Sequence, residues 1–103
     1  MYRHRFYAQI VYGHFKENLE VWERLNELAR SRGWAESTFW APTVGTGNQF
    51  IVETDYPDLT TFQRQSEAFF ADSEAMTLFR STSEHVVEGS AHDEILQTAP
   101  QLA

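Results

Sequence analysis

The apolar and polar positions of residues 48–56 alternate with a period of two, which predicts a β-strand. One face carries Phe50, Val52 and Thr54, and the other carries Gln49, Ile51, Glu53 and Asp55. Pro57 cannot continue the hydrogen bonding of a strand, and Asp58 is a good helix N-cap. A helix is therefore expected to begin at residue 59.

The first half of the chain predicts a strand, a helix and a second strand. Residues 5–13 alternate and place Phe6, Ala8, Ile10 and Tyr12 on one face, as core candidates. Residues 15–32 predict an amphipathic helix, with Gly33 placed for a left-handed C-terminal cap. The next strand is expected within residues 35–44, where Pro42 indicates an edge or a bulge.

The second half predicts a hairpin, a broken helix and a last strand. The turn at residues 45–48, GTGN, joins the strands on either side of it into a hairpin. The helical region over residues 59–85 is interrupted at Asp72 and Ser73, which are suited to cap a new helix. The last strand is expected within residues 87–97, and residues 98–103 are expected to be a frayed tail.

This order of elements predicts a single α+β domain over residues 4–97. Two β-α-β halves with right-handed crossovers give a four-stranded antiparallel sheet with helices on one face, the ferredoxin-like arrangement. The helices leave the other face uncovered, and that face mixes apolar and polar side chains. Pairing two such faces in a symmetric homodimer would bury the apolar part and leave a polar-lined cleft.

Three stretches carry a resemblance to a known superfamily. They are VYGHFKENLEVWERL, NQFIVETDYPDLTTFQRQ and ADSEAMTLFRS, and the likeness covers roughly residues 4–97. In these stretches the chain resembles the dimeric α+β barrel superfamily, in particular NIPSNAP-like proteins and antibiotic-biosynthesis-monooxygenase-like domains. The resemblance implies a homodimer whose two sheets form a barrel. Members of the superfamily include cofactor-independent oxygenases, haem degraders, isomerases and ligand-binding regulators.

Composition and charge exclude several classes of partner. The formal charge of −7 and the scattered lysines and arginines disfavour nucleic acid and anionic membranes. The chain has no cysteine, so it has no disulfide framework and no thiolate metal site. No stretch resembles a signal peptide or a membrane span, and we expect a soluble, cytoplasmic protein. Eight Phe, four Tyr and three Trp are many for a small chain and indicate surface that needs a partner.

The candidate catalytic residues are Glu53 and His92. Glu53 lies on the expected uncovered face, where it is either a carboxylate base or an interface residue paired with Arg3 or Arg5. His92 shares a face with Glu94, which is typical of a base oriented by a carboxylate but also of an exposed histidine near a chain end.

Four further side chains are candidates for ligand binding on the same uncovered face: Tyr7, Gln9, Trp40 and Gln49. Tyr7 and Gln9 are able to hydrogen-bond a ligand or to satisfy each other. Trp34 and Trp40 are candidates for an aromatic pocket wall, or for core and interface positions.

Motifs for metals, nucleotides and nucleophilic catalysis are missing. Neither H-x-x-x-H nor H-E-x-x-H occurs, so no metal site is predicted, and His85 stands too late in its helix to favour haem. GTG at residues 45–47 lies in a hairpin rather than at the start of a helix, so it is no phosphate cradle. We expect no cofactor.

The leading hypothesis is a NIPSNAP-like protein that binds a small apolar or aromatic molecule. Its ligand is expected between the uncovered face and the helices, or between the two sheets of the dimer. One alternative is a cofactor-independent monooxygenase or isomerase that acts on such a molecule. The other is a structural dimer module without a ligand, whose barrel interior would be filled by aromatic side chains.

Overall fold

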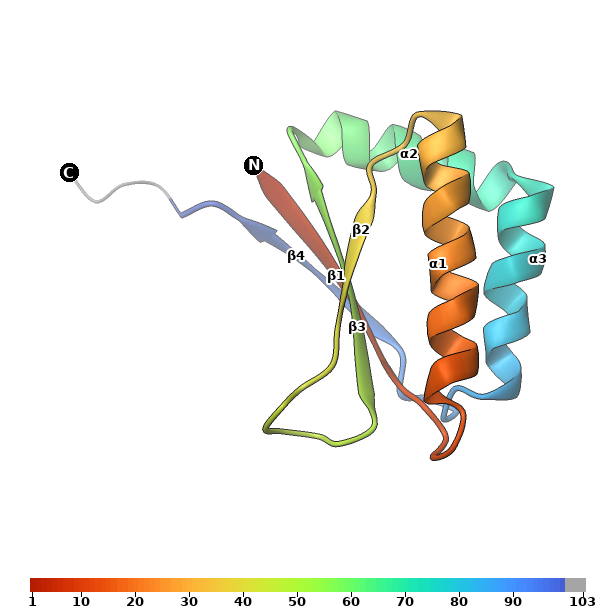
Figure 1. Ribbon diagram of the computed structural model, residues 1–103. Helices are drawn as coiled ribbons and strands as arrows, with labels where there is room; N and C mark the ends of the chain where they lie inside the picture. Colours follow the sequence, from red (N-terminus) through yellow and green to blue (C-terminus); the bar gives the residue numbers. More distant parts are fainter. Residues whose placement is uncertain (100–103) are drawn as a thin grey trace.

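The computed structural model describes residues 1–99 of the chain, and in it a four-stranded sheet carries three α-helices on one face (Figure 1). The elements in chain order are β1 (Tyr2–Gln9), α1 (Phe15–Arg32), β2 (Ser37–Trp40), β3 (Gln49–Tyr56), α2 (Leu59–Ala71), α3 (Ser73–Ser81), a 3₁₀ turn (Thr82–Glu84) and β4 (His92–Gln97). The predicted α+β class and the predicted order of strands and helices are confirmed.

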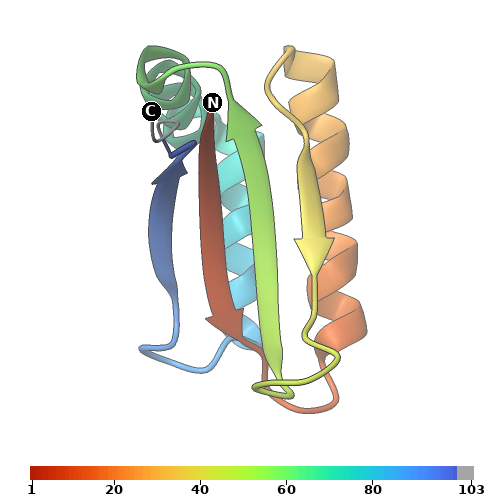
Figure 2. The same ribbon diagram turned by 90° about the vertical axis from the view of Figure 1, so that its left-hand side faces the viewer.

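The sheet has the strand order β2-β3-β1-β4, and every neighbouring pair is antiparallel. This is the predicted ferredoxin-like order, with β1 and β3 in the centre (Figure 2). In Figure 2 the sheet faces the viewer and the helices lie behind it, so one face of the sheet has no helix over it. The register places His4 of β1 between Thr54 of β3 and Ile95 of β4.

Strand β1 is shifted relative to its predicted range of residues 5–13. It begins at Tyr2 and ends at Gln9, after which Ile10 forms an isolated bridge with Val86. The prediction of Tyr12 as a core residue was wrong, because its side chain is 78 % exposed. A turn closed by a hydrogen bond from His14 N to Val11 O, at 3.0 Å, carries the chain out of the sheet before Tyr12 can point inward.

Helix α1 has the bounds that the sequence predicts, and its C-terminal cap is the predicted one. Gly33 adopts a left-handed conformation with φ of 73°, and its N–H is directed at the carbonyls of Ala29 and Arg30. Glycine adopts this conformation without the steric cost that a β-carbon brings.

The second helical region is broken at Asp72, as predicted. The Asp58 carboxylate accepts a hydrogen bond from Thr61 N at 2.6 Å and begins α2, while the Asp72 carboxylate accepts from Ala75 N at 2.9 Å and begins α3. Helix α2 therefore crosses one end of the sheet, whereas α1 and α3 run side by side along it (Figure 1). Two large apolar side chains of α2, Leu59 and Phe70, are exposed.

The fully buried apolar side chains form two separate clusters. One lies on the sheet and consists of Ala8, Ile10, Phe50 and Val52. The other lies between the helices and consists of Leu25, Leu28 and Ala75. Large aromatic side chains stand around both clusters and are only partly buried, notably Trp22, Phe69 and Phe79. The interior between sheet and helices is therefore not filled.

A polar pair is buried where the chain enters α1. The imidazole Nε2 of His85 lies 3.0 Å from Asn18 Oδ1, and both side chains are buried. The sequence placed His85 at a helix end, and it follows directly after the 3₁₀ turn.

Beyond β4, the N–H and hydroxyl of Thr98 both donate to the Met1 carbonyl, at 3.0 and 3.2 Å. The rest of the expected frayed tail, residues 100–103, lies outside the described residues.

Replacement of Gly33 by alanine should lower the free energy of unfolding by about 1 kcal/mol, the cost of a β-carbon in a left-handed conformation. Urea unfolding followed by circular dichroism would measure the change. Gly47→Ala is the matched control, because Gly47 is not left-handed and a β-carbon there meets Tyr12 Oη at an ordinary 3.8 Å. Equal losses in the two variants would contradict the assigned cap.

Candidate ligand pocket

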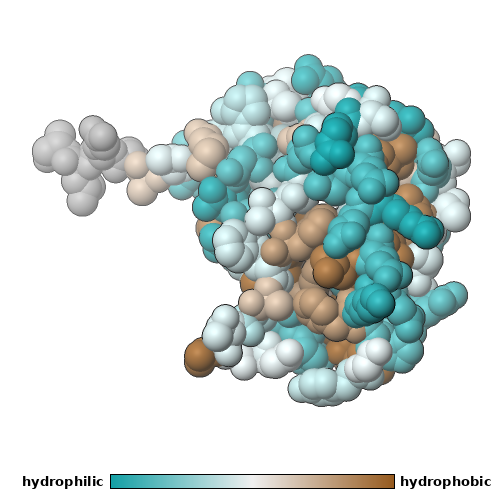
Figure 3. All heavy atoms as spheres, in the orientation of Figure 1, coloured by the Kyte–Doolittle hydropathy of each residue, from teal (hydrophilic) through white to brown (hydrophobic). Residues whose placement is uncertain are grey.

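A cavity of about 760 Å³ lies between the helices and the sheet face that they cover. Nine aromatic rings line it, from the sheet, from α1, from α2 and α3, and from the segment before β2: Phe6, Trp22, Trp34, Phe39, Tyr56, Phe62, Phe69, Phe70 and Phe79. Figure 3 shows hydrophobic atoms gathered between β2 and α1, while the outer side of α1 is hydrophilic. A volume of this size lies within the range of about 300–1,000 Å³ that is typical of small-molecule sites.

The helical wall of the cavity is formed by one face of α1, and two hydrogen bonds fix its position relative to the segment that contains β2. Trp22, Leu25, Asn26 and Ala29 recur along one face of α1 and line the cavity. Asn26 Oδ1 accepts a hydrogen bond from Ser37 N at 2.7 Å, which fixes β2 to α1. Gln65 Oε1 accepts from Ala35 N at 2.9 Å, which fixes α2 to the same segment. These two hydrogen bonds therefore position the walls together with the packing of Trp22 against Phe6 and Phe50.

The cavity also holds a few polar groups. Ser37 Oγ and Thr54 Oγ1 lie 2.6 Å apart, so each hydroxyl satisfies the other. Burial raises the pKa of Tyr56, which keeps its phenol neutral through the physiological range. His4 Nε2 lies 3.1 Å from Asp93 Oδ1, and both residues line the cavity.

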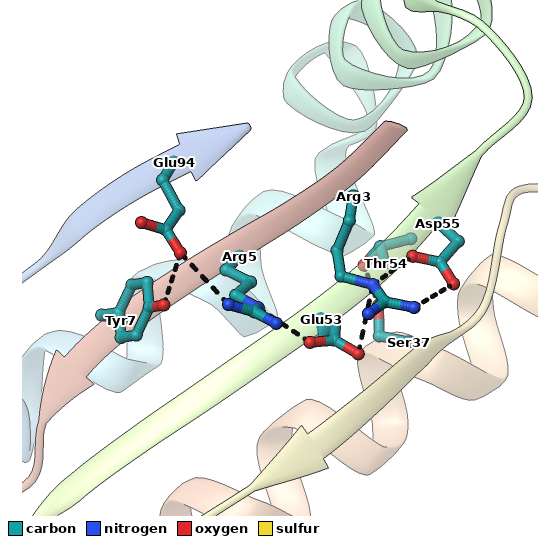
Figure 4. A network of polar contacts seen from close by, with 8 residues as sticks. All are labelled: Arg3, Arg5, Tyr7, Ser37, Glu53, Thr54, Asp55 and Glu94. Carbon is teal, nitrogen blue, oxygen red and sulfur yellow. Dashed lines mark hydrogen bonds and ion pairs between the residues drawn. The ribbon is translucent and has the colours of Figure 1, made fainter. Parts of the chain in front are cut away.

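The uncovered face carries a charged ladder that runs across the strands (Figure 4). Arg5 Nε donates to Glu53 at 2.9 Å, and Arg5 Nη1 lies 3.5 Å from Glu94. Arg3 Nε lies 2.8 Å from Asp55 and 3.4 Å from Glu53. The carboxylate of Glu53 is therefore shared between two guanidinium groups, and its side chain is only 14 % exposed.

Asp55 is the carboxyl group of this ladder whose pKa is shifted. The hydrogen bond from Arg3 lowers the pKa of Asp55 below its usual range. Because the native pKa is the lower one, this carboxylate stabilises the fold at neutral pH, and the stabilisation is lost as the pH falls through the native pKa. The side chains are well exposed to solvent, so the contribution is small.

Tyr7, His92 and Glu94 meet on the uncovered face. The Tyr7 hydroxyl donates to Glu94 Oε1 at 2.6 Å, and this hydrogen bond raises the pKa of Tyr7. The His92 ring is stacked on the Tyr7 ring at 4.6 Å between centroids, and its Nδ1 lies 3.3 Å from Ser90 O. Glu94 thus binds Tyr7 and Arg5, while His92 packs beside them.

The structure places all six predicted site residues away from the cavity. Glu53, His92, Tyr7, Gln9, Trp40 and Gln49 lie on the uncovered face, and none of them lines the cavity. Tyr7 pairs with Ile51, which in turn pairs with Trp40, so an aromatic and apolar row crosses β1, β3 and β2. Gln9 and Gln49 face each other at the end of the central strand pair. Trp34, by contrast, lines the cavity. This agrees with the first of its two predicted roles, the wall of an aromatic pocket.

His4 and Asp93 were not among the site residues predicted from the sequence. Both stand on the covered face, where their strand neighbours Phe6 and Ile95 are apolar. The available signal was a polar residue on a strand face whose other residues are apolar. It was hidden because β1 was predicted to begin at residue 5, one position after His4.

Two absences hold for residues 1–99. No group of three or more His, Asp or Glu side chains in this part of the chain is arranged to hold a metal ion. No helix among these residues combines the length and apolar character needed to cross a membrane.

This fold is found in two named groups of solved proteins, NIPSNAP domain proteins and antibiotic biosynthesis monooxygenases. The resemblance that the sequence analysis stated is confirmed at the level of the fold. No protein-family model matches the sequence, and no curated protein matches it either.

Three solved structures illustrate the likeness. An uncharacterised NIPSNAP domain protein from Burkholderia xenovorans has a TM-score of 0.80 and 18 % identity, over 100 % of this chain and 99 % of that chain. A NIPSNAP family protein from Agrobacterium tumefaciens has a TM-score of 0.76 and 16 % identity, over 95 % and 85 % of the two chains. An antibiotic biosynthesis monooxygenase has a TM-score of 0.74 and 13 % identity, over 97 % and 100 %. At these identities the likeness shows a shared fold.

Removal of the central carboxylate by Glu53→Gln should lower the free energy of unfolding by about 1 kcal/mol, because the two guanidinium groups lose their shared negative charge and the amide keeps only one acceptor oxygen. Thermal and urea unfolding would measure the loss. Glu36→Gln is the control, since the Glu36–Arg30 pair has a good distance of 2.7 Å but is well exposed and should cost only a few tenths of that. A loss at Glu53 no larger than at Glu36 would show that the ladder does not stabilise the sheet.

Proposed function

We propose that the protein binds a small apolar or aromatic molecule with one or two polar groups in the cavity between sheet and helices. The cavity itself carries this proposal. It is large enough for such a molecule, aromatic rings line it, and polar groups such as the Ser37–Thr54 hydroxyl pair lie among them. The sequence led us to expect a ligand between the uncovered face and the helices, or between the two sheets of a dimer, and this cavity lies between the helices and the covered face.

A hydrophobic driving force supports the same proposal. Trp22, Phe69 and Phe79 are core-sized side chains that remain only partly buried, because the cavity lies beside them. A ligand that removed this apolar surface from water would gain about 25 cal/mol per Å². The neutral Tyr56 phenol and the Ser37–Thr54 hydroxyl pair offer hydrogen bonds without a charge.

The alternative of a structural dimer module, whose mark would be a barrel interior between the two sheets filled by aromatic side chains, stays a prediction, because the cavity lies on the other face of the sheet. The enzymatic alternative, a cofactor-independent monooxygenase or isomerase, stays a prediction. The likeness to a protein named an antibiotic biosynthesis monooxygenase is consistent with it but does not favour it.

We also propose that two copies of the chain pair through their uncovered sheet faces. The row Tyr7–Ile51–Trp40 leaves large apolar side chains on a face with no helix, and Trp40 is 52 % exposed. Beside this row the charged ladder already satisfies its own ions, so it can be covered without leaving an unpaired carboxylate. In a two-fold symmetric dimer, the Tyr7–Ile51–Trp40 row of one copy would pack against the same row of the other copy.

Binding should be visible as thermal stabilisation by a small aromatic compound. A ligand present at about 100 times its Kd adds about 2.7 kcal/mol to the free energy of unfolding. We expect this shift with nitrobenzene and related compounds in differential scanning fluorimetry. Native mass spectrometry of the purified protein would test directly for a ligand carried through purification.

The variant Ala29→Phe should reduce the ligand-induced shift, because a phenyl ring at this wall position of α1 takes up part of the cavity and of its apolar wall. Ala41→Phe is its control, since Ala41 is exposed in the segment between β2 and β3 and does not line the cavity. Equal shifts in the wild type and Ala29→Phe would place the binding site elsewhere, and no shift with any compound would contradict the proposed function.

Replacement of Ile51 by lysine should convert a dimer into a monomer, because it places a charge in the middle of the apolar row. Light scattering coupled to size-exclusion chromatography would give the masses. Val44→Lys, in a fully exposed position outside the sheet, should leave the dimer intact. A wild-type monomer at all concentrations would rule out the pairing.

A further inference from the structure

We propose that His4 and Asp93 form a proton-accepting pair in the cavity wall, and that the ligand is an aromatic or conjugated molecule with an acidic hydroxyl, such as a phenol or an enol. The inference deepens the proposed function and rests on it, because the ligand must occupy the same cavity. We call this pair the His4–Asp93 dyad.

The dyad is assembled from the two ends of the chain. His4 lies in the central strand β1 and Asp93 in the edge strand β4, and Nε2 of the one is 3.1 Å from Oδ1 of the other. The His4 ring lies 5.4 Å from the ring of Phe62 on α2, which in turn packs edge-on against Tyr56. The imidazole is therefore held between a carboxylate and an aromatic wall that belongs to the cavity.

The position of the dyad differs from that of an ordinary surface pair. The covered face of β1 continues from His4 through Phe6 and Ala8, and the latter is fully buried. The side chain of His4 is 23 % exposed, whereas that of Asp93 is 59 % exposed. The ring therefore faces the apolar cavity, and the carboxylate reaches solvent, which gives a route for protons to leave.

The hydrogen bond defines which nitrogen can act. A carboxylate only accepts hydrogen bonds, so Nε2 carries the hydrogen and donates it to Asp93. The lone pair of the neutral ring is then on Nδ1, to which no side chain among residues 1–99 is hydrogen-bonded. A carboxylate that orients an imidazole in this way also stabilises the imidazolium that forms on protonation.

The proton transfer balances without a further reactant. The O–H bond of the ligand breaks, its electron pair stays on oxygen, and a new N–H bond forms at His4 Nδ1. The products are a phenolate or enolate and an imidazolium, whose positive charge is offset by Asp93. The step involves no oxidation or reduction, and it is reversible.

Other titratable groups at the cavity do not replace the dyad. Tyr56 is neutral, because burial raises its pKa. Glu67 accepts a hydrogen bond from Gln63 within α2 at 3.4 Å and is exposed. The neighbouring arginines, Arg3 and Arg5, lie on the opposite face of the sheet and are bound to Asp55 and Glu53.

The test compares para-nitrophenol with nitrobenzene, which has the same ring and nitro group but no hydroxyl. The buffer is kept at about pH 6.5, where free para-nitrophenol is mostly the neutral phenol and an ordinary imidazole is still partly neutral and able to accept a proton. We expect the wild-type protein to bind para-nitrophenol about tenfold more tightly than nitrobenzene, and the bound phenol to show the visible absorption band of the phenolate. Titration calorimetry gives the affinities, and difference absorbance gives the ionisation state.

The variant His4→Gln should remove the phenolate band and the tenfold preference, while nitrobenzene binds as before and shows that the cavity is intact. Asp93→Asn keeps the ring but loses the charge that stabilises the imidazolium, so it should weaken the band. His14→Gln is the matched control. His14 also pairs with a carboxylate, Glu17 at 3.3 Å, but lies outside the cavity, so this variant should behave as the wild type.

Each other outcome overturns the inference in a recognisable way. Binding of both probes with equal affinity and no phenolate band would overturn the dyad and leave the proposed function standing. A phenolate band that survives in His4→Gln would assign the proton to another group. Failure of both probes to bind would overturn the dyad and the proposed function together.

Discussion

The carboxylate of Asp72 fixes the direction of the chain at the point on which the interior depends. Its Oδ1 accepts from Ala75 N at 2.9 Å and begins α3, and its Oδ2 lies 2.9 Å from Arg32 Nε at the end of α1. These hydrogen bonds lower the pKa of Asp72 and hold it ionised. Asp72 thereby holds α3 against α1, and the preceding helix α2 lies across the end of the sheet (Figure 1). In this position α2 forms one wall of the cavity and does not fill it.

Local signals in the sequence were sufficient for most of the architecture. Each helix begins or ends at a residue whose side chain or backbone satisfies free hydrogen-bonding groups: Asp58, Asp72 and Gly33. Alternation in β3 was strong enough to predict the sheet face of residues 49–55. The ends of β1 were misjudged, because the turn that removes Tyr12 depends on a backbone contact that leaves little trace in composition.

The candidate site was harder to predict, for a physical reason. A cavity is a volume that side chains leave empty when separate elements pack together. The spacing of residues along one strand or helix does not show how much volume is left empty. Polar residues on the uncovered face drew attention, yet Glu53 and Tyr7 turned out to be bound to neighbours within the same ladder. The residues that meet at the cavity, such as Trp22, Thr54 and Phe62, come from three separate elements and look like ordinary core.

The sheet also has an order of assembly. Its central strand β1 is the first element of the chain, but one of its two partners is the last, and His4 and Asp93 are 89 residues apart. Contacts of such long range close late and slow folding, because chain entropy must be lost before they form. During synthesis, one edge of β1 stays unpaired until residues 92–97 have emerged. The helices and the aromatic lining of the cavity can form earlier. The His4–Asp93 pair is therefore completed in the final folding step.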